Sequence, residues 1–205
     1  NRYGLPDRLG VATRQAAIGG TLCAVYFIDV DRLKAVNDML GHRAGDLLIR
    51  ATADRLSARV GPRVTRFGGD EFVLVVEDTR SASEAEELGR RIVADLARPI
   101  EVEGNHVRSS ASVGLTLADR STTPDELLRQ ADVALYRAKA LGRSCLATYS
   151  VDEDTGLDAD LDRLKPLHAR RSHPPSDVSQ APERPVTARS GTGNPDYGPY
   201  PVSML

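Results

Sequence analysis

Apolar and polar positions along the first 150 residues follow two periods, one typical of strands and one typical of helices. Short apolar runs predict five strands, at 21–30, 64–67, 72–76, 106–117 and 145–149. The first run is nearly continuous, which is typical of a strand buried on both faces, and its end carries the carboxylate of Asp29. The second and third runs flank Gly68-Gly69-Asp70-Glu71, a small-residue turn that predicts a hairpin with an acidic tip.

Four amphipathic segments predict helices, at 31–40, 45–60, 83–96 and 124–141. Asp31 is placed to cap the first helix, and Pro99 ends the third because proline has no backbone N–H to donate. The fourth has the strongest start, with the Thr123 hydroxyl as cap and Pro124 at the first helical position, and it stops at Gly142. The order strand, two helices, hairpin, helix, strand, helix, strand predicts an α+β fold, a mixed sheet with helices packed on it.

The last quarter of the chain differs in composition from the rest. All three Phe and all five Ile precede residue 101, whereas eight of the twelve prolines lie in residues 151–205. A segment with so few large apolar side chains does not offset the entropy of ordering its own backbone, which costs about 1 to 2 kcal/mol per residue. We therefore predict one domain at 1–150 and a disordered tail, rich in Pro, Ser and Arg, at 151–205.

Charge and cysteine content narrow the classes of function. With 27 Lys and Arg against 29 Asp and Glu, the net charge is -2, so the chain lacks the basic field that binds nucleic acid non-specifically. No apolar run reaches the length of about 18 residues that predicts a membrane segment. Only Cys23 and Cys145 are present, which we interpret as small core residues in a cytoplasmic protein. Because the chain begins at Asn1 without Met, we expect a fragment with an upstream sensor or regulatory domain.

Acidic side chains gather in three places: Asp29-Val30-Asp31, Asn37-Asp38 with Asp46, and Asp70-Glu71. A single acidic cluster is usually a solvated loop, but apolar residues flank the first and third of these. If the first strand lies beside the hairpin, their carboxylates converge. Converging carboxylates commonly hold a hard divalent cation such as Mg²⁺, together with substrate phosphates.

An anion site is predicted next to these carboxylates. The helix at 31–40 directs its first free N–H groups toward the end of the strand that carries Asp29, and such groups bind phosphates. Lys139 and Arg143, four residues apart on the last helix, would supply cations. Their spacing alone fits equally well a lysine that interacts with the helix dipole and a solvated arginine.

Five collinear blocks carry a family resemblance over residues 1–150. They are DVDRLKAVND at 29–38, GHRAGD at 41–46, RFGGDEF at 66–72, SVG at 112–114 and ADVALYRAKALGR at 131–143. Together they resemble the signature blocks of the GGDEF family of diguanylate cyclases. The resemblance implies a palm-like nucleotide-cyclase fold and a symmetric dimer that condenses two GTP into cyclic di-GMP with release of two pyrophosphates. The alternatives are a catalytically silent GTP-binding module and a cyclase that makes a mononucleotide product.

The resemblance also implies a metal site and a catalytic pair. Asp29, the Val30 carbonyl, Asp70 and Glu71 would hold Mg²⁺ or Mn²⁺. Asp70 and Glu71 would be catalytic, with Glu71 either a metal ligand or the group that helps to deprotonate the attacking 3′-hydroxyl.

The substrate-binding residues implied by the resemblance fall into three groups, which are guanine readers, phosphate binders and small turn residues. Asn37 and Asp46 would read guanine, because a carboxylate accepts from the ring N–H and the neighbouring exocyclic amine, an adjacent pair of donors that adenine lacks. The triphosphate would be bound by the amides of 31–34, which include Leu33 and Lys34, together with Lys139 and Arg143. Gly68 and Gly69, without Cβ atoms, would let the nucleotide approach closely.

Three positions depart from the family pattern. Many members carry an Arg-x-x-Asp product site, where this chain has Arg59-Val60-Gly61-Pro62. Pro62 neither accepts a guanine hydrogen bond with its side chain nor donates one from its backbone, so we predict no feedback inhibition through this site, although Arg59 can still contact a phosphate. Leu33 replaces a frequent Phe, a change that keeps the position apolar. The family's opening block is poorly represented: its remnant is either Asn1-Arg2 or Leu5-Pro6-Asp7-Arg8, and chain length favours Asn1-Arg2.

Overall fold

A five-stranded sheet organises the described part of the chain, which in this computed structural model comprises residues 2–102, 104–118, 122–152 and 154. The strands of this sheet are β1 (Leu22–Val30), β2 (Val64–Arg66), β3 (Glu71–Thr79), β6 (Ala111–Ala118) and β7 (Leu146–Thr148). Their order is β2-β3-β1-β6-β7, in which the β6–β7 pair is parallel and every other pair antiparallel. The predicted mixed sheet is therefore confirmed, with β1 at its centre.

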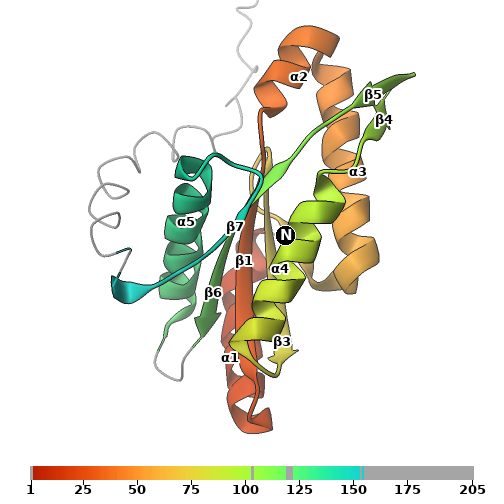
Figure 1. Ribbon diagram of the computed structural model, residues 1–205. Helices are drawn as coiled ribbons and strands as arrows, with labels where there is room; N and C mark the ends of the chain where they lie inside the picture. The colour runs from red at the N-terminus through yellow and green to blue at the C-terminus, as the bar shows by residue number, and fades with distance from the viewer. Residues whose placement is uncertain (1, 103, 119–121, 153, 155–205) are drawn as a thin grey trace, which may run out of the picture. The chain divides into compact units, whose positions relative to one another are not determined.

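Helices cover both faces of the sheet (Figure 1). The α-helices of the described residues are α1 (Leu5–Gly19), α2 (Leu33–Leu40), α3 (His42–Val60), α4 (Ala82–Leu96) and α5 (Pro124–Ala140). One apolar cluster packs α1 and α5 against Val25 and Phe27 of β1. The other packs α3 and α4 against Tyr26 and Ile28. Because neighbours in a strand point to opposite faces, the continuous apolar run predicted for β1 supplies both clusters.

Two predicted helix starts have different outcomes. Thr123 caps α5 as predicted, and its hydroxyl accepts from the Glu126 amide at 3.2 Å. The predicted cap at Asp31 is wrong: α2 begins after Arg32, which adopts a left-handed φ of 58° and makes no side-chain cap bond. The Asp31 carboxylate instead accepts hydrogen bonds from distant elements, and these compete successfully with a local cap.

The single strand predicted at 106–117 is divided in the structure. Residues Asn105–Val107 form β5, which pairs with β4 (Ile100–Val102) in a separate two-stranded sheet, and only β6 belongs to the large sheet. Gly104, with φ of 78°, lies in the tight connection between β4 and β5. Periodicity does not reveal such a division, because three residues are too few to define a period.

Helix α1 was absent from the prediction. Its buried positions are Leu5, Leu9, Ala12 and Ala16, so that two of the four are small and the apolar face is weakly marked. The helix ends at Gly19, and the following residue, Gly20, has a left-handed φ of 69° that lets its amide donate to the Ala16 carbonyl.

The predicted tail at 151–205 lies outside the described residues apart from Val151, Asp152 and Asp154. Asp154 is completely buried, and one of its carboxylate oxygens lies 3.3 Å from an Arg137 guanidinium nitrogen of α5. Among the described helices, none combines the length and the apolar character that crossing a bilayer requires.

Cys23 is buried as predicted, with 1% of its surface exposed, and burial followed by the Glu77 charge raises the pKa of its thiol from 9.0 to about 12. We expect native Cys23 to resist iodoacetamide at about pH 8.5, where an unfolded thiol reacts. Above about pH 9 the unfolded chain loses this proton while the folded chain keeps it, so this thiol lowers stability as pH rises. Mass spectrometry of the alkylated protein measures the labelling, and rapid native labelling of Cys23 would contradict the expectation.

Candidate active site

Arg66 holds the turn that joins β2 and β3. Its guanidinium donates to the Gly68 carbonyl at 3.2 Å and to the Gly69 carbonyl at 2.7 Å. A backbone bond of 2.8 Å from the Phe67 amide to the Glu71 carbonyl closes the turn. The sequence-based prediction assigned no role to Arg66, although a charged side chain two and three residues before bare glycine carbonyls was an available signal.

The same turn is bound to the end of β1. The Val30 amide donates to the Asp70 carbonyl at 3.0 Å, and Asp29 lies directly opposite Glu71 in the pairing of β1 with β3. Strand alternation places Asp29 on the face of Phe27, which α1 and α5 cover. The first strand therefore does lie beside the hairpin, and the carboxyl-bearing positions Asp29 and Glu71 face each other.

Helix α5 brings a cation to this pair. The Lys139 ammonium nitrogen lies 2.8 Å from Asp29 Oδ2, and only 12% of the Asp29 side chain is exposed. The helix lies close to the sheet at Gly114, where an added Cβ would be 2.1 Å from the Ala131 carbonyl oxygen. The bare backbone of β6 at this position thus sets how near the α5 side chains come to the carboxylates.

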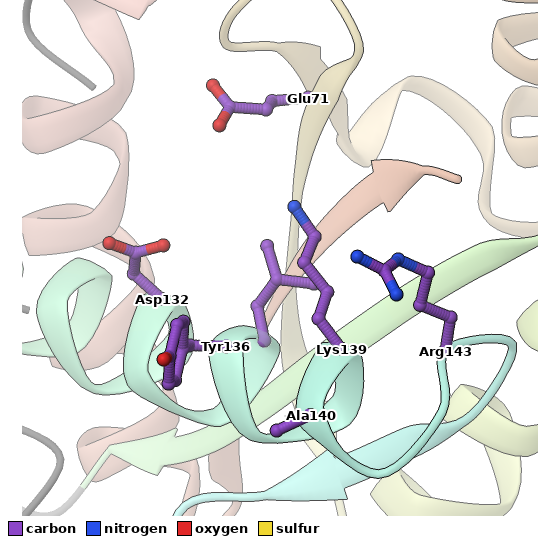
Figure 2. Close-up of a pocket in the computed structure, with 7 residues that line it drawn as sticks. Glu71, Asp132, Tyr136, Lys139, Ala140 and Arg143 are labelled. Atoms are coloured by element: carbon purple, nitrogen blue, oxygen red, sulfur yellow. The ribbon is translucent and has the colours of Figure 1, made fainter. Parts of the chain in front are cut away.

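A pocket of about 330 Å³ opens between the hairpin and α5 (Figure 2). Its lining residues are Glu71, Asp132, Leu135, Tyr136, Lys139, Ala140 and Arg143. In Figure 2 the Glu71 side chain lies across the pocket from the polar side chains of α5. Asp132 and Tyr136 were missed by the sequence-based prediction, although residues 132, 136 and 139 are spaced by four and three and so share one face of α5.

The pocket does not gather all of the predicted site residues. Of the predicted set, Glu71, Lys139 and Arg143 line it. Asp29 joins them through its contact with Lys139. The predicted guanine and phosphate residues of α2 and α3, together with the turn glycines, are not part of this lining.

Negative charge accumulates at the hairpin end of the pocket. Burial raises the pKa of Glu71 to about 7, and the nearby charges of Asp29 and Asp70 add to the effect. Burial also raises the pKa of Asp29, which the Lys139 ammonium partly opposes. The pKa of both carboxyl groups is raised because ionising two buried, neighbouring carboxylates is costly. A bound cation would offset this cost, so the site favours one.

The donor set fits a divalent cation that also contacts phosphate. No group of three or more acidic, histidine or cysteine side chains within the described residues is arranged to hold a metal ion. Asp29 and Glu71 supply two facing carboxylates, and the carbonyl of Val30 follows Asp29 directly. Mg²⁺ is usually held by one or two carboxylates together with substrate oxygens, so these groups fit Mg²⁺ better than they fit a metal that needs a complete protein cage.

The two turn glycines have different surroundings. A Cβ on Gly68 would lie 2.4 Å from Glu71 Oε2, so the missing side chain leaves room for the Glu71 carboxylate. A Cβ on Gly69 would meet nothing within 4 Å. The space at Gly68 is therefore used by the protein itself, whereas the space at Gly69 is open to an approaching ligand.

A second polar feature lies between α2 and α3. The Asn37 Oδ1 atom is buried and has no hydrogen-bond partner. It packs on Gly45, where an added Cβ would lie 1.9 Å from it. The next residue on α3 is the exposed Asp46. Because a buried acceptor without a partner is costly, Asn37 next to Asp46 is suited to a ligand that donates hydrogen bonds.

The predicted phosphate-binding amides are only partly available. The Asp31 amide donates to the Ser110 carbonyl at 2.8 Å, so its predicted role in binding phosphate is wrong. The amides of Leu33 and Lys34 belong to the first turn of α2, and the Lys34 side chain is exposed. The exposed Arg143 lies in a left-handed backbone conformation, with φ of 68°, just after α5.

Comparisons with known proteins agree with this fold. Residues 1–145 match the family model described as "Diguanylate cyclase, GGDEF domain". The GGDEF domain of TpbB (YfiN) from Pseudomonas aeruginosa superimposes with a TM-score of 0.72 at 33% identity, covering 80% of this chain and 94% of that one. The GGDEF domain of DgcB from Caulobacter crescentus, solved in complex with c-di-GMP, gives 0.66 at 26% identity, covering 72% and 90%.

Two curated relatives have names that include diguanylate cyclase. The bifunctional diguanylate cyclase/cyclic di-GMP phosphodiesterase MucR of P. aeruginosa is 42% identical over 147 residues, which cover 70% of this chain and 21% of MucR. Diguanylate cyclase TpbB is 37% identical over 147 residues, covering 70% of this chain and 34% of TpbB. The chain thus spans a fifth to a third of these two relatives. With its sheet order, acidic hairpin and family match, the chain belongs to the GGDEF domain family of diguanylate cyclases.

Proposed function

We propose that this chain is an active diguanylate cyclase that condenses two GTP into cyclic di-GMP and two pyrophosphates. The observation that carries the proposal is the pocket in which Glu71, paired with Asp29 across strands β3 and β1, faces Lys139 of α5 and Arg143 of the turn that follows α5. Buried carboxylates and cations around one cavity suit a triphosphate and its metal ion. The use of GTP is consistent with a cytoplasmic location, which we propose for the domain.

Asp29, the Val30 carbonyl, Asp70 and Glu71 would hold Mg²⁺ or Mn²⁺ in this proposal. When bound, such an ion neutralises phosphate charge and polarises the reacting phosphoryl group. Until then, the Lys139 ammonium neutralises part of the charge on Asp29, at 2.8 Å. Lys139 and Arg143 would then contact the triphosphate, together with the amides of Leu33 and Lys34 at the start of α2.

Guanine would be read between α2 and α3. The unpartnered Asn37 Oδ1 accepts hydrogen bonds, and the exposed Asp46 carboxylate accepts from the ring N–H and exocyclic amine of guanine. Adenine lacks both donors in this arrangement, so the pair favours GTP over ATP. The open face of Gly69 leaves space for the nucleotide at the hairpin.

The bond-forming step needs two copies of the chain. Each copy holds one GTP, so the 3′-hydroxyl of one GTP attacks the α-phosphorus of the other, and the bond to pyrophosphate breaks. Glu71, which lines the pocket, would take the proton of the attacking hydroxyl. Two such steps close the ring, so we propose a symmetric dimer in which the two pockets face each other.

Product analysis at several protein concentrations tests the proposal. The chain is incubated with GTP and Mg²⁺, and products are separated by mass. Cyclic di-GMP whose formation rises more steeply than in proportion to protein concentration supports a dimeric cyclase. Bound GTP without turnover at high protein concentration would instead identify a silent binding module, and cyclic GMP would identify a mononucleotide cyclase.

We expect no inhibition by cyclic di-GMP through the position of the family's product site. Arg59 there donates its Nε to Asp95 Oδ2 of α4 at 2.7 Å and makes a second bond to the same oxygen. Pro62 takes the place of the acceptor. Both groups that would hold the product are therefore occupied or missing.

Titrating cyclic di-GMP against initial rate measures this inhibition. Arg59→Ala is the matched variant, and its inhibition curve should superimpose on that of the unchanged protein. Inhibition at low micromolar product that Arg59→Ala abolishes would contradict the expectation.

A further inference from the structure

Asp31 is a buried carboxylate whose hydrogen-bond donors come from two elements far away in the sequence. Its Oδ1 accepts from the Ser112 hydroxyl at 2.7 Å, and its Oδ2 accepts from the Ser110 hydroxyl at 2.7 Å. Oδ2 also accepts from the Ser144 amide at 3.2 Å. With 4% of the residue exposed, Asp31 joins the end of β1 to the start of β6 and to the turn between α5 and β7.

The turn between α5 and β7 has an unusual backbone. Gly142, Arg143 and Ser144 have φ of 115°, 68° and 52°, three consecutive residues in the left-handed region. Arg143 and Ser144 carry side chains, for which this conformation is unfavourable and persists only when the surroundings impose it. The hydrogen bond from the Ser144 amide to Asp31 is one of the contacts that impose it.

This turn carries a side chain of the active site. Arg143 lines the pocket with Glu71, and Lys139, which lies in the last turn of α5, precedes it by four residues. Backbone bonds from the Arg143 amide to the Ala138 carbonyl (3.1 Å) and from the Val113 amide to the Cys145 carbonyl (3.0 Å) hold the two sides of the turn. Asp31 holds its middle, at Ser144.

We propose that Asp31 is a positioning residue. It fixes the left-handed turn at 142–144 so that the Arg143 guanidinium faces the part of the pocket that would bind the triphosphate. The proposal rests on the proposed function, because Arg143 is given the triphosphate as its ligand there. Asp31 itself does not contact the nucleotide. Its carboxylate is directed to Ser110, Ser112 and Ser144 instead.

To hold the turn at 142–144, the side chain at position 31 needs hydrogen-bond acceptor atoms but not a negative charge. In Asp31→Asn the side-chain carbonyl still accepts from the Ser144 amide, and the new NH₂ group donates to the Ser112 hydroxyl, which rotates to accept. In Asp31→Ala all three donors lose their partner. We therefore expect the conservative variant to keep nucleotide affinity within about threefold, whereas Asp31→Ala weakens it about tenfold, the loss expected for one charged hydrogen bond.

A double-mutant cycle tests whether Asp31 acts through Arg143. Affinity is measured for the α,β-methylene analogue of GTP with Mg²⁺ in Asp31→Ala, Arg143→Ala and the double variant, with melting temperatures recorded for each. If Asp31 only positions Arg143, the double variant binds about as weakly as Arg143→Ala alone. Multiplying losses, or a loss in Asp31→Asn as large as in Asp31→Ala, would overturn the proposal. Asp54→Asn, an exposed carboxylate on α3, is the matched control and should bind as the unchanged protein does.

Hydrogen exchange of the Ser144 amide tests, without any nucleotide, whether Asp31 holds the turn at 142–144. Protection of this amide should fall in Asp31→Ala, persist in Asp31→Asn and be unchanged in Asp54→Asn. Equal protection in all variants overturns the proposal. If the unchanged protein binds no GTP analogue, the proposed function fails, and the exchange result then decides by itself whether Asp31 holds the turn.

Discussion

Replacing Glu71 with glutamine is expected to lower the rate of cyclic di-GMP formation by roughly 10² to 10⁴-fold, the range for loss of a positioned acid or base. Glu71 lies opposite Asp29, lines the pocket and is partly buried, with its pKa raised to about 7. Glutamine keeps the shape but neither accepts the proton of the attacking hydroxyl nor supplies negative charge to a metal ion. The measurement is the initial rate of product formation under saturating GTP and Mg²⁺.

Glu77→Gln is the matched control for this variant. Glu77 lies on the same strand, β3, six residues beyond Glu71 and outside the pocket lining. We expect this control to retain its activity and both variants to melt within a few degrees of the unchanged protein. A Glu71→Gln variant that keeps full activity would contradict the assignment of the site, whereas equal losses in both variants would point to a general effect on the strand.

Adding a single methyl group at Gly114 is expected to destabilise the protein by about 3 kcal/mol and to weaken GTP binding. The Cβ of Gly114→Ala would lie 2.1 Å from the Ala131 carbonyl oxygen and 2.2 Å from the Leu135 amide nitrogen. Both are backbone atoms of α5, so no side-chain rotation relieves the clash and the helix must move away from β6. Lys139, whose ammonium reaches Asp29, would move with it.

Thermal or urea unfolding measures the loss of stability, and titration with the GTP analogue measures the loss of affinity. Gly19→Ala is the control, because a Cβ there meets only an ordinary contact, with Thr21 Oγ1 at 3.7 Å, at the end of α1. Alanine favours a helix over glycine, so the control should be neutral or slightly stabilising. A Gly114→Ala protein with unchanged stability and affinity would show that α5 is not held at this distance.

The order of elements was predictable wherever local chemistry was strong. Thr123 and Pro124 defined the start of α5, and the glycine turn before Glu71 defined the hairpin. The prediction failed where several elements competed for one group. Asp31 has the side chain of a helix cap, yet the hydroxyls of Ser110, just before β6, and of Ser112, on β6, donate to it. A local rule contains no information about donors that lie about eighty residues away.

Helix α1 escaped prediction for a different reason. Its buried face includes alanines at 12 and 16, and α5 and the sheet accept these small residues because they allow close packing. The stripe that predicted α5 also contained alanines, but it had more leucines and a clear Thr-Pro start, whereas α1 buries only two large residues and has no side-chain cap, so it gave little signal.

The chemical identity of the candidate site was more predictable than its contacts. The block motifs named Asp29, Glu71, Lys139 and Arg143, and the structure brings Lys139 to Asp29 over more than a hundred residues of sequence. The role of Gly68 is different from the prediction in one respect, since its missing side chain makes room for Glu71. Such contacts depend on how α5 and the hairpin pack, which a family motif does not describe.

The contact between the buried Asp154 and Arg137 of α5 lies beyond the last strand and bears on the extent of the folded domain. Asp154 lies six residues beyond the last strand, accepts a hydrogen bond from the Ser150 amide at 2.8 Å and contacts Arg137 on α5. A polypeptide cut after residue 150 would lack the Asp154 carboxylate. The largely buried Arg137 guanidinium would then lose this partner. We therefore expect the folding unit to extend at least to Asp154, and shortened versions of this chain should retain that residue.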